Sequence, residues 1–350
     1  MKQKFKALLI GAVLSIGLNG QGLAATAKKE QVAPSKKAQS AAGQKTAKKS
    51  TASNAKTAAK AAPKKLGSAP RGSHFAATDG HSAKPVRKVA MTDSDAGRLA
   101  LYSASALVID QASGQALVDK NSHEVVPIAS ISKLMTAMVV LDAKLDLNEV
   151  IAIGDEDVDG LKGTRSRLPV GTTMTRETAM LLALMSSENR AAHALGRHYP
   201  GGLPAFVQAM NRKAQMLGMT NSRFEEPTGL SSNNVSTAHD LVRMVTAAAR
   251  YPEIRQFSTT AEARIELNGR IRDFGNTNAL VRSDNWEIGV SKTGYISEAG
   301  RCLVMQARVA DKPVVIVLLD SQGKMTRVGD ANRIKRWMES ASLAQERKRT

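Results

Sequence analysis

The sequence predicts an α+β fold, in which an antiparallel sheet is flanked by helices and completed by a mostly helical lobe. Three observations support this prediction. Short apolar runs typical of strands begin just after Arg98, a long middle region has helical periodicity, and further strand-like runs precede a final helical segment. Strands from the two ends of this region can therefore share one sheet, with the helical middle as a second lobe beside a cleft.

The predicted strands are bounded by turn residues. The first two flank Ser113-Gly114, and the last two flank an Ala-Asp-Lys-Pro segment, so each pair is typical of a β-hairpin. The ranges are 104–110, 115–119, 288–296, 303–309 and 314–320.

The predicted helices carry apolar residues at helical spacing. In residues 131–145 these residues are frequent enough to indicate a largely buried helix. Thr237-Ala-His-Asp240 is an N-capping signature in front of a later helix. The ranges are 131–145, 176–185, 190–198, 241–250 and 328–345.

Residues 1–27 are predicted to be a secretory signal peptide. Lysines at its start form a positive region, residues 7–18 form an uncharged apolar stretch, and small residues within 24–27 provide a cleavage site. The apolar stretch is shorter than the roughly 20 residues that a membrane-spanning helix needs. We therefore expect the mature protein to be periplasmic.

Residues 28–92 are predicted to be a disordered basic linker. Residues 28–90 hold 15 Lys and Arg against two acidic residues, a net charge of +13 out of +19 for the whole chain. They contain almost no large apolar side chains, so they cannot bury enough surface to offset the entropy cost of ordering. The linker is either a peripheral attachment to the anionic cell envelope or a solvated spacer.

Composition excludes several other classes. Aromatic residues make up 3% of the chain, which leaves few base-stacking side chains, and predicted export separates the chain from nucleic acid. The six histidines and the single cysteine form no H-x-x-x-H or C-x-x-C pattern, which argues against a zinc enzyme. His239, within the capping signature, is assigned a structural role.

Three short motifs occur in order along residues 93–345. They are Ser130-Ile-Ser-Lys133, Ser187-Glu-Asn189 and Lys292-Thr293-Gly294. The first two patterns also occur elsewhere, for example in Ser321…Lys324 and Ser283-Asp-Asn285, whereas K-T-G occurs once. Order and local context, rather than any single match, therefore carry the evidence.

Local context favours Ser130 as a nucleophile. It stands at the start of the predicted buried helix, and Lys133 lies on the same helix face three residues later. Burial can lower the pKa of a lysine, so that its neutral amine acts as a base. Ser187-Glu-Asn189 separates two predicted helices and can project into the cleft. Lys292 would place a positive charge suited to a substrate carboxylate, and Gly294 would leave room for a ligand strand.

Further stretches extend this pattern well beyond the three motifs. They are 127–136, 185–192, 224–230, 236–240, 276–278 and 292–302. Together they resemble the low-molecular-mass penicillin-binding proteins, the group of D-Ala-D-Ala carboxypeptidases and endopeptidases, over about residues 95–341. The resemblance implies a penicillin-binding-protein or β-lactamase-like transpeptidase fold for residues 93–345. It also implies peptidoglycan peptides as substrates and β-lactam antibiotics as covalent inhibitors.

The resemblance also implies residue roles. Ser130 attacks the D-Ala carbonyl, Lys133 accepts its proton, and Ser187 relays a proton to the leaving amine. The implied substrate-binding residues are Asn189, Lys292, Thr293, Gly294 and Tyr295. Backbone N–H groups of Ser130 and Tyr295 would form the oxyanion hole. No metal or organic cofactor is implied.

Two features favour a D-alanyl-D-alanine endopeptidase, which cleaves D-Ala–diaminopimelate cross-links. Ser-Glu-Asn-Arg-Ala at 187–191 resembles the endopeptidase branch, and the sequence ends soon after its last predicted helix, without the β-rich domain usual in the carboxypeptidase branch. A D-alanyl-D-alanine carboxypeptidase is the second hypothesis. A β-lactamase is the third, although residues 190–291 contain no E-x-x-L-N. A non-catalytic cell-wall-binding protein is the fourth.

Overall fold

The computed structural model describes residues 99–347 of the chain. The predicted signal peptide (1–27), the predicted linker (28–92) and the first six residues of the predicted domain lie outside the described residues. No helix within 99–347 combines the length and the apolar character that crossing a membrane requires.

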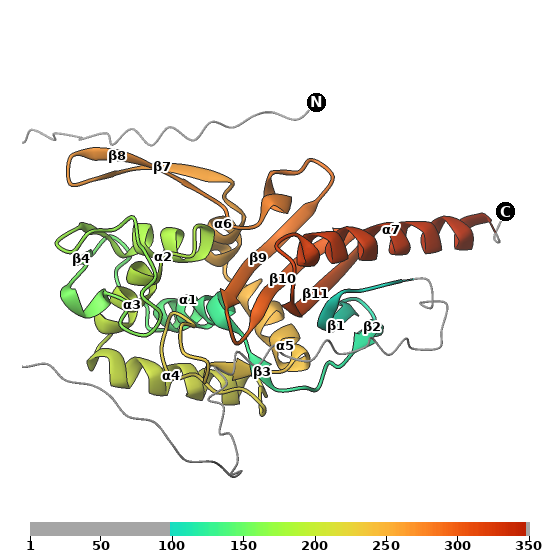
Figure 1. Cartoon of the computed structure of the whole chain (residues 1–350), viewed down its shortest axis with the longest axis horizontal. Coiled ribbons are helices and arrows are strands. Elements are labelled where there is room, and N and C mark those ends of the chain that lie inside the picture. The colour runs from blue at the N-terminus through green and yellow to red at the C-terminus, as the bar shows by residue number, and fades with distance from the viewer. Residues whose placement is uncertain (1–98, 348–350) are drawn as a thin grey trace, which may run out of the picture. The chain divides into compact units, whose positions relative to one another are not determined.

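A five-stranded antiparallel sheet forms the centre of the fold, in the order β2-β1-β11-β10-β9 (Figure 1). Its strands are β1 (Ser103–Asp110), β2 (Ala116–Lys120), β9 (Glu287–Ile296), β10 (Gly300–Val309) and β11 (Lys312–Ser321). Both predicted hairpins are confirmed. The pairing of β1 with β11 also confirms that strands from the two ends of the domain share one sheet.

Seven helices lie within the described residues. They are α1 (Ser132–Asp142), α2 (Arg176–Met185), α3 (Asn189–Arg197), α4 (Gly202–Met216), α5 (Ala238–Ala248), α6 (Pro252–Thr259) and α7 (Thr326–Arg347). Five match predicted helices, with ends shifted by a few residues. Neither α4 nor α6 was predicted from the sequence. Both have proline in the first turn. Backbone N–H groups of the first turn make no hydrogen bond within the helix, so proline, which has no N–H, is tolerated there.

Three short strand pairs complete the fold. They are β3 (Val126–Pro127) with β6 (Val235–Ser236), β4 (Val150–Ala152) with β5 (Thr173–Thr175), and the unpredicted hairpin of β7 (Glu262–Leu267) with β8 (Arg270–Gly275). The first pair matters most for the site, because β3 runs directly into the short 3₁₀ helix of Ala129–Ile131 and then into α1.

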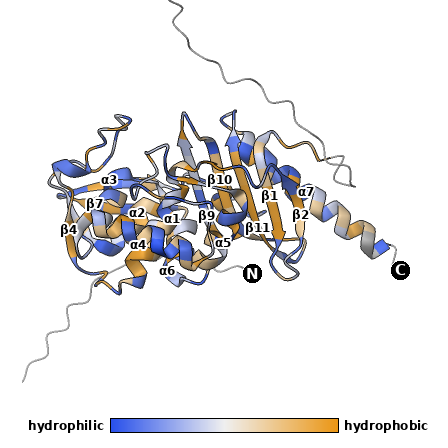
Figure 2. Ribbon diagram, turned by 90° about the horizontal axis from the view of Figure 1, so that it is seen from below, coloured by the Kyte–Doolittle hydropathy of each residue, from blue (hydrophilic) through white to orange (hydrophobic). Residues whose placement is uncertain are grey.

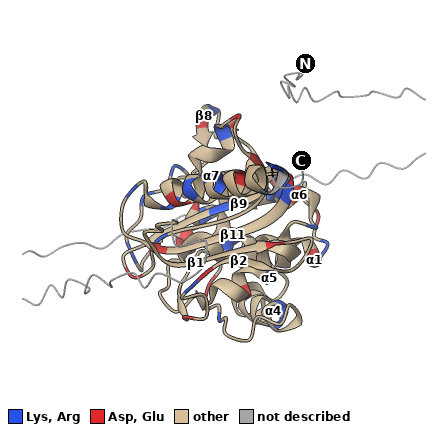
Figure 3. Ribbon diagram, turned by 90° about the vertical axis from the view of Figure 1, so that its right-hand side faces the viewer, with Lys and Arg blue, Asp and Glu red and all other residues tan. Residues whose placement is uncertain are grey.

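The sheet is buried on both faces, which explains the continuous apolar runs of its central strand. Val314, Ile316 and Leu318 of β11 pack with α7, whereas the alternating Val315 and Val317 belong to the core shared with the helical lobe. Figure 3 shows α7 on one side of the sheet and α5 on the other, and Figure 2 shows that the strands of the sheet are largely hydrophobic. The edge strand β9 contacts α6 and the 3₁₀ helix before α1, which belong to the helical part of the fold.

Asp330 anchors α7 to the start of β1 and provides a test of this packing. Its buried carboxylate accepts hydrogen bonds from the backbone of Ser103 at 2.7 Å and from the Ser103 hydroxyl at 2.6 Å. We expect Asp330→Ala to lower the free energy of unfolding by about 3 kcal/mol, because it leaves these buried donors unpaired. The measurement is urea unfolding followed by circular dichroism. Glu339→Ala, on the exposed side of α7, is the control and should change stability by about 0.5 kcal/mol or less.

Candidate active site

The three sequence motifs converge from three separate elements. Ser130 lies in the 3₁₀ turn before α1, Ser187 lies between α2 and α3, and Lys292 lies on the edge strand β9. Hydrogen bonds link Lys133 with Ser130 and Asn189, and Lys292 with Ser187. The structure therefore brings together the side chains that the sequence predicted would meet.

Lys133 is the most connected group of the site. Its Nζ lies 2.8 Å from Ser130 Oγ, 2.8 Å from Asn189 Oδ1 and 2.7 Å from the carbonyl oxygen of Thr228. The side chain is 1% exposed, because it stands on the first turn of a helix that is buried along nearly its whole length. Three acceptors thus surround one buried amine.

Burial lowers the pKa of Lys133 to about 7, although the nearby charges of Glu226 and Glu188 act in the opposite direction. A large fraction of the amine is therefore neutral at neutral pH. A neutral amine can give its two hydrogens to Asn189 Oδ1 and the Thr228 carbonyl, which directs its lone pair at the Ser130 hydroxyl. This arrangement suits removal of the hydroxyl proton.

Ser187 and Lys292 form the opposite wall. Lys292 Nζ donates to Ser187 Oγ at 3.0 Å and to the carbonyl of Thr293 at 2.9 Å. Ser187 has a φ of 61°, a left-handed conformation that is uncommon for a residue with a side chain and that often occurs at functional sites. Burial lowers the pKa of Lys292 well below its usual value, and the charges of Lys133 and Arg327 lower it further.

Two glycines let the backbone approach the turn that carries Ser130. A Cβ on Gly294 would lie 2.9 Å from the carbonyl oxygen of Ile128 and 3.1 Å from the nitrogen of Ser130. A Cβ on Gly229, whose φ is 81°, would lie 1.9 Å from the carbonyl oxygen of Ala129. The sequence analysis explained Gly294 by the approach of a ligand. The structure adds that the nucleophile turn itself packs against it.

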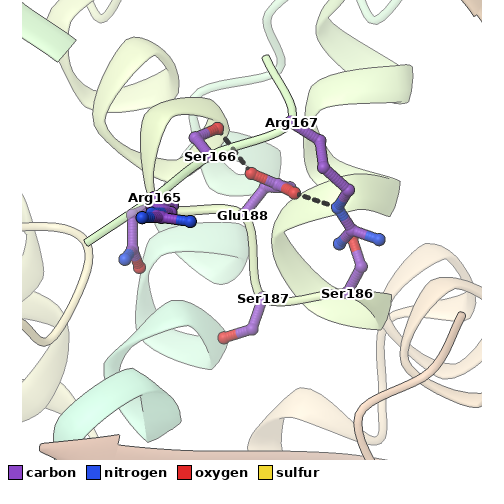
Figure 4. Close-up of a pocket in the computed structure, with 7 residues that line it drawn as sticks. Arg165, Ser166, Arg167, Ser186, Ser187 and Glu188 are labelled. Atoms are coloured by element: carbon purple, nitrogen blue, oxygen red, sulfur yellow. Dashed lines mark hydrogen bonds and ion pairs between the residues drawn. The ribbon is translucent and has the colours of Figure 1, made fainter. Parts of the chain in front are cut away.

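Glu188, the middle residue of the second motif, points away from Ser187. Its buried carboxylate accepts hydrogen bonds from Ser166 Oγ at 2.7 Å and from Arg167 Nε at 2.8 Å (Figure 4). Residues 165–167 and 186–189 line a pocket of about 390 Å³. Glu188 thus fixes a loop beside the catalytic groups, and Asn189 Nδ2 reaches the same loop through Thr164 Oγ1 at 3.0 Å.

Two of the predicted binding residues have environments that the sequence did not define. Thr293 Oγ1 donates to Thr277 Oγ1 at 2.7 Å, so that hydroxyl is held by a residue outside the motifs. The Tyr295 side chain is 54% exposed and packs under the guanidinium of Arg301, 4.5 Å from the ring centre. The predicted role of Tyr295 concerns its backbone N–H and involves no side-chain contact with Ser130.

Arg327 is a site residue that the sequence analysis missed. It lies in the first turn of α7, and its Nη1 is 3.4 Å from the carbonyl oxygen of Gly294. Its Nε is buried and has no hydrogen-bond partner in the described part of the chain. Burial lowers its pKa, and Arg301 adds to the effect. No motif surrounds Arg327 in the sequence, so only the packing of α7 beside β9 reveals it.

Comparison with known proteins identifies the family of this chain. The family model Peptidase_S11, described as D-alanyl-D-alanine carboxypeptidase, matches residues 90–323. A Pseudomonas aeruginosa protein named D-alanyl-D-alanine endopeptidase is 50% identical over 245 residues, which cover 69% of this chain and 79% of that protein. An Escherichia coli protein of the same name is 47% identical over the same coverage.

The fold has relatives among solved structures. The Streptomyces K15 DD-transpeptidase superposes with a TM-score of 0.64 at 26% sequence identity, covering 70% of this chain and 98% of that one. Its match supports the predicted transpeptidase-like fold, and the family model covers the three motifs as well as the sheet and helical lobe. The chain therefore belongs to the D-alanyl-D-alanine carboxypeptidase family of serine peptidases.

Proposed function

We propose that the chain is a D-alanyl-D-alanine endopeptidase, which hydrolyses D-Ala–diaminopimelate cross-links of peptidoglycan through an acyl-enzyme on Ser130. One observation carries the proposed chemistry: the buried Lys133 amine, with a pKa of about 7, lies 2.8 Å from Ser130 Oγ. The choice of endopeptidase is supported by the relatives of that name, which are 47–50% identical to this chain.

Acylation begins when Ser130 Oγ attacks the D-Ala carbonyl carbon of the cross-link. Its proton passes to Lys133 Nζ, and the backbone N–H groups of Ser130 and Tyr295 stabilise the negative oxygen that develops. The C–N bond of the cross-link then breaks, and Ser187 Oγ, which is hydrogen-bonded to Lys292, relays a proton to the departing amine: it gives up its own proton and takes up the one held by Lys133. Water finally hydrolyses the ester and restores the serine.

The cationic wall would bind the anionic part of the substrate. Lys292 lies on β9, and Arg327 lies beside the same strand at Gly294. Within residues 99–347, Arg327 Nε is a buried donor without a hydrogen-bond partner, and a guanidinium so placed is suited to bind a substrate carboxylate. Asn189 would hold the peptide, with its amide oxygen fixed by Lys133. β-Lactam antibiotics carry a reactive carbonyl and a carboxylate, so they would acylate the same serine.

The location of this reaction follows from its substrate. Peptidoglycan lies outside the cytoplasm, in agreement with the predicted signal peptide, so we propose a periplasmic enzyme. The predicted linker, with its net charge of +13 over residues 28–90, would hold the enzyme near the anionic envelope.

The nucleophile is tested by covalent labelling. We expect Ser130→Ala to abolish labelling by fluorescent penicillin, because among the described residues the hydroxyl hydrogen-bonded to the Lys133 amine is that of Ser130. Ser321→Ala is the matched control: it alters the other S-x-x-K match in the described chain, and its hydroxyl is bonded to Ser103 instead. Intact-mass measurement should show an adduct on the control only. An adduct on Ser130→Ala would contradict the assignment.

The pH dependence tests the base. The ammonium form of Lys133 cannot accept a proton, so the acylation rate should fall about tenfold per pH unit below pH 7 and level off above it. Stopped-flow acylation between pH 5 and about 9 measures the profile. Lys133→Arg, which stays protonated, should be inactive at every pH. An acylation rate that still rises about tenfold per pH unit at the upper end of this range would rule out a Lys133 pKa near 7.

Arg327 is tested with a substrate that bears a free carboxylate. We expect Arg327→Ala to raise KM by about 10- to 100-fold, with a smaller effect on kcat, because a charge-assisted hydrogen bond is lost. Arg327→Lys should recover part of the loss. Arg336→Ala, on the exposed side of α7, is the control. An unchanged KM in Arg327→Ala would remove this residue from the substrate site.

The reaction type is tested on purified muropeptides. Cross-linked dimers should be converted into monomers, whereas pentapeptide monomers should lose terminal D-Ala slowly or not at all. Loss of D-Ala from monomers without cleavage of dimers would instead identify a carboxypeptidase. Rapid destruction of penicillin without a stable adduct would identify a β-lactamase.

A further inference from the structure

Asp119, His123 and His239 form a cluster outside the catalytic site. Asp119 lies near the end of β2, His123 lies in the turn that follows, and His239 lies in the first turn of α5, the helix below the sheet in Figure 3. One ligand atom from each residue can be chosen so that all three lie within 4.8 Å of one another. Two imidazoles and a carboxylate are donors that zinc commonly accepts.

The environment of His239 favours a ligand at its Nε2. Its Nε2 is buried and has no hydrogen-bond partner within the described residues, and the nearest carboxylate oxygen, Asp119 Oδ2, is 3.8 Å away. A buried polar atom without a partner calls for a physical explanation. A cation between His239 Nε2 and Asp119 Oδ2 would satisfy both atoms.

Neighbouring groups orient the carboxylate for this role. Ser122 Oγ donates to Asp119 Oδ1 at 2.5 Å, so Oδ2 is the oxygen left for a ligand. The backbone N–H of His239 also reaches the carbonyl of Ser122, at 3.4 Å, which ties the turn to the helix. Hydrogen bonds from such outer residues orient ligands in protein metal sites. The nearby Lys120 amine is directed elsewhere, to the carbonyls of Leu101 and Ser103.

The histidine rings lie close together, and rotation of the exposed His123 side chain would let both bind one ion. They stack with centroids 4.2 Å apart and an angle of 23° between their planes. Donors of a tetrahedral zinc ion lie roughly 3.3 Å from one another, given zinc–ligand distances near 2.0–2.1 Å. His123 and Asp119 are exposed, so rotation of their side chains can bring the three donor atoms, which lie within 4.8 Å of one another, to this separation.

We propose that Asp119, His123 and His239 bind a divalent transition-metal ion, with zinc as the best match to the donors. Three protein ligands leave a fourth position for water. The ion would join the end of β2 to α5. The β6 strand just before α5 pairs with β3, which leads to Ser130, so the ion would brace the support of the nucleophile turn. This proposal is independent of the proposed peptidase activity.

The experiment is Zn²⁺ titration of the chelator-treated full chain, in competition with a chromophoric indicator. His74 and His81 are replaced by alanine in every sample, so that histidines of the predicted linker do not contribute. We expect one Zn²⁺ per chain at micromolar concentration. At hundredfold excess over Kd, the ion should raise Tm by about 5–10 °C. Co²⁺ should give the strong visible absorption of a four-coordinate ion.

Single variants assign the ligands. Ser122 does not bind the ion but orients Asp119, so Ser122→Ala should weaken Zn²⁺ binding by about 10- to 100-fold. A larger loss is expected when a ligand itself is replaced, in His123→Ala, His239→Ala and Asp119→Asn. His198→Ala is the matched control and should bind like the parent chain. His123 is exposed, so His123→Ala should fold even if His239→Ala does not. The melting curve of metal-free His123→Ala checks this. Unchanged binding in His123→Ala, or no saturable binding at millimolar Zn²⁺, would overturn the proposal.

Discussion

The burial of one amine, that of Lys133, is the constraint on which the rest of the site depends. An exposed lysine would stay protonated and could not serve as a base, so the first turn of α1 has to lie within the core. The polar contacts of this amine come from three parts of the chain: Ser130 beside it, Asn189 at the start of α3, and the Thr228 carbonyl. Its position therefore couples the nucleophile to the helical lobe.

Close backbone packing holds the nucleophile turn in place. Gly229 and Gly294 both approach the segment of Ile128–Ser130, at distances that leave no room for a Cβ without a backbone shift. Glu226 supports the first of these approaches, since its carboxylate accepts the N–H groups of Thr228 and Gly229, each at 2.6 Å. The same carboxylate also raises the pKa of Lys133, so one acidic residue serves both geometry and proton affinity.

Cationic groups along β9 define the other half of the site. Lys292 is fully buried among polar atoms of Ser187 and Thr293, and Arg327 of α7 lies next to Gly294. Their mutual repulsion and their desolvation both favour a bound anion. Helix α7, which covers the face of the sheet opposite α5, thus contributes directly to the surface on which the proposed substrate would lie.

The sequence by itself determined the local features: the two hairpins of the main sheet, most helices, the order of the three motifs, and the pairing of Ser130 with Lys133. Hydrophobic period and helix geometry act over a few residues, so these features leave a local signal. Only the tertiary structure decided several other contacts across long sequence separations. Arg327 beside Gly294, Glu226 near Lys133, and His239 against Asp119 have no local signal. Their proximity follows from how the sheet, α5 and α7 pack, and packing depends on shape complementarity across the whole domain.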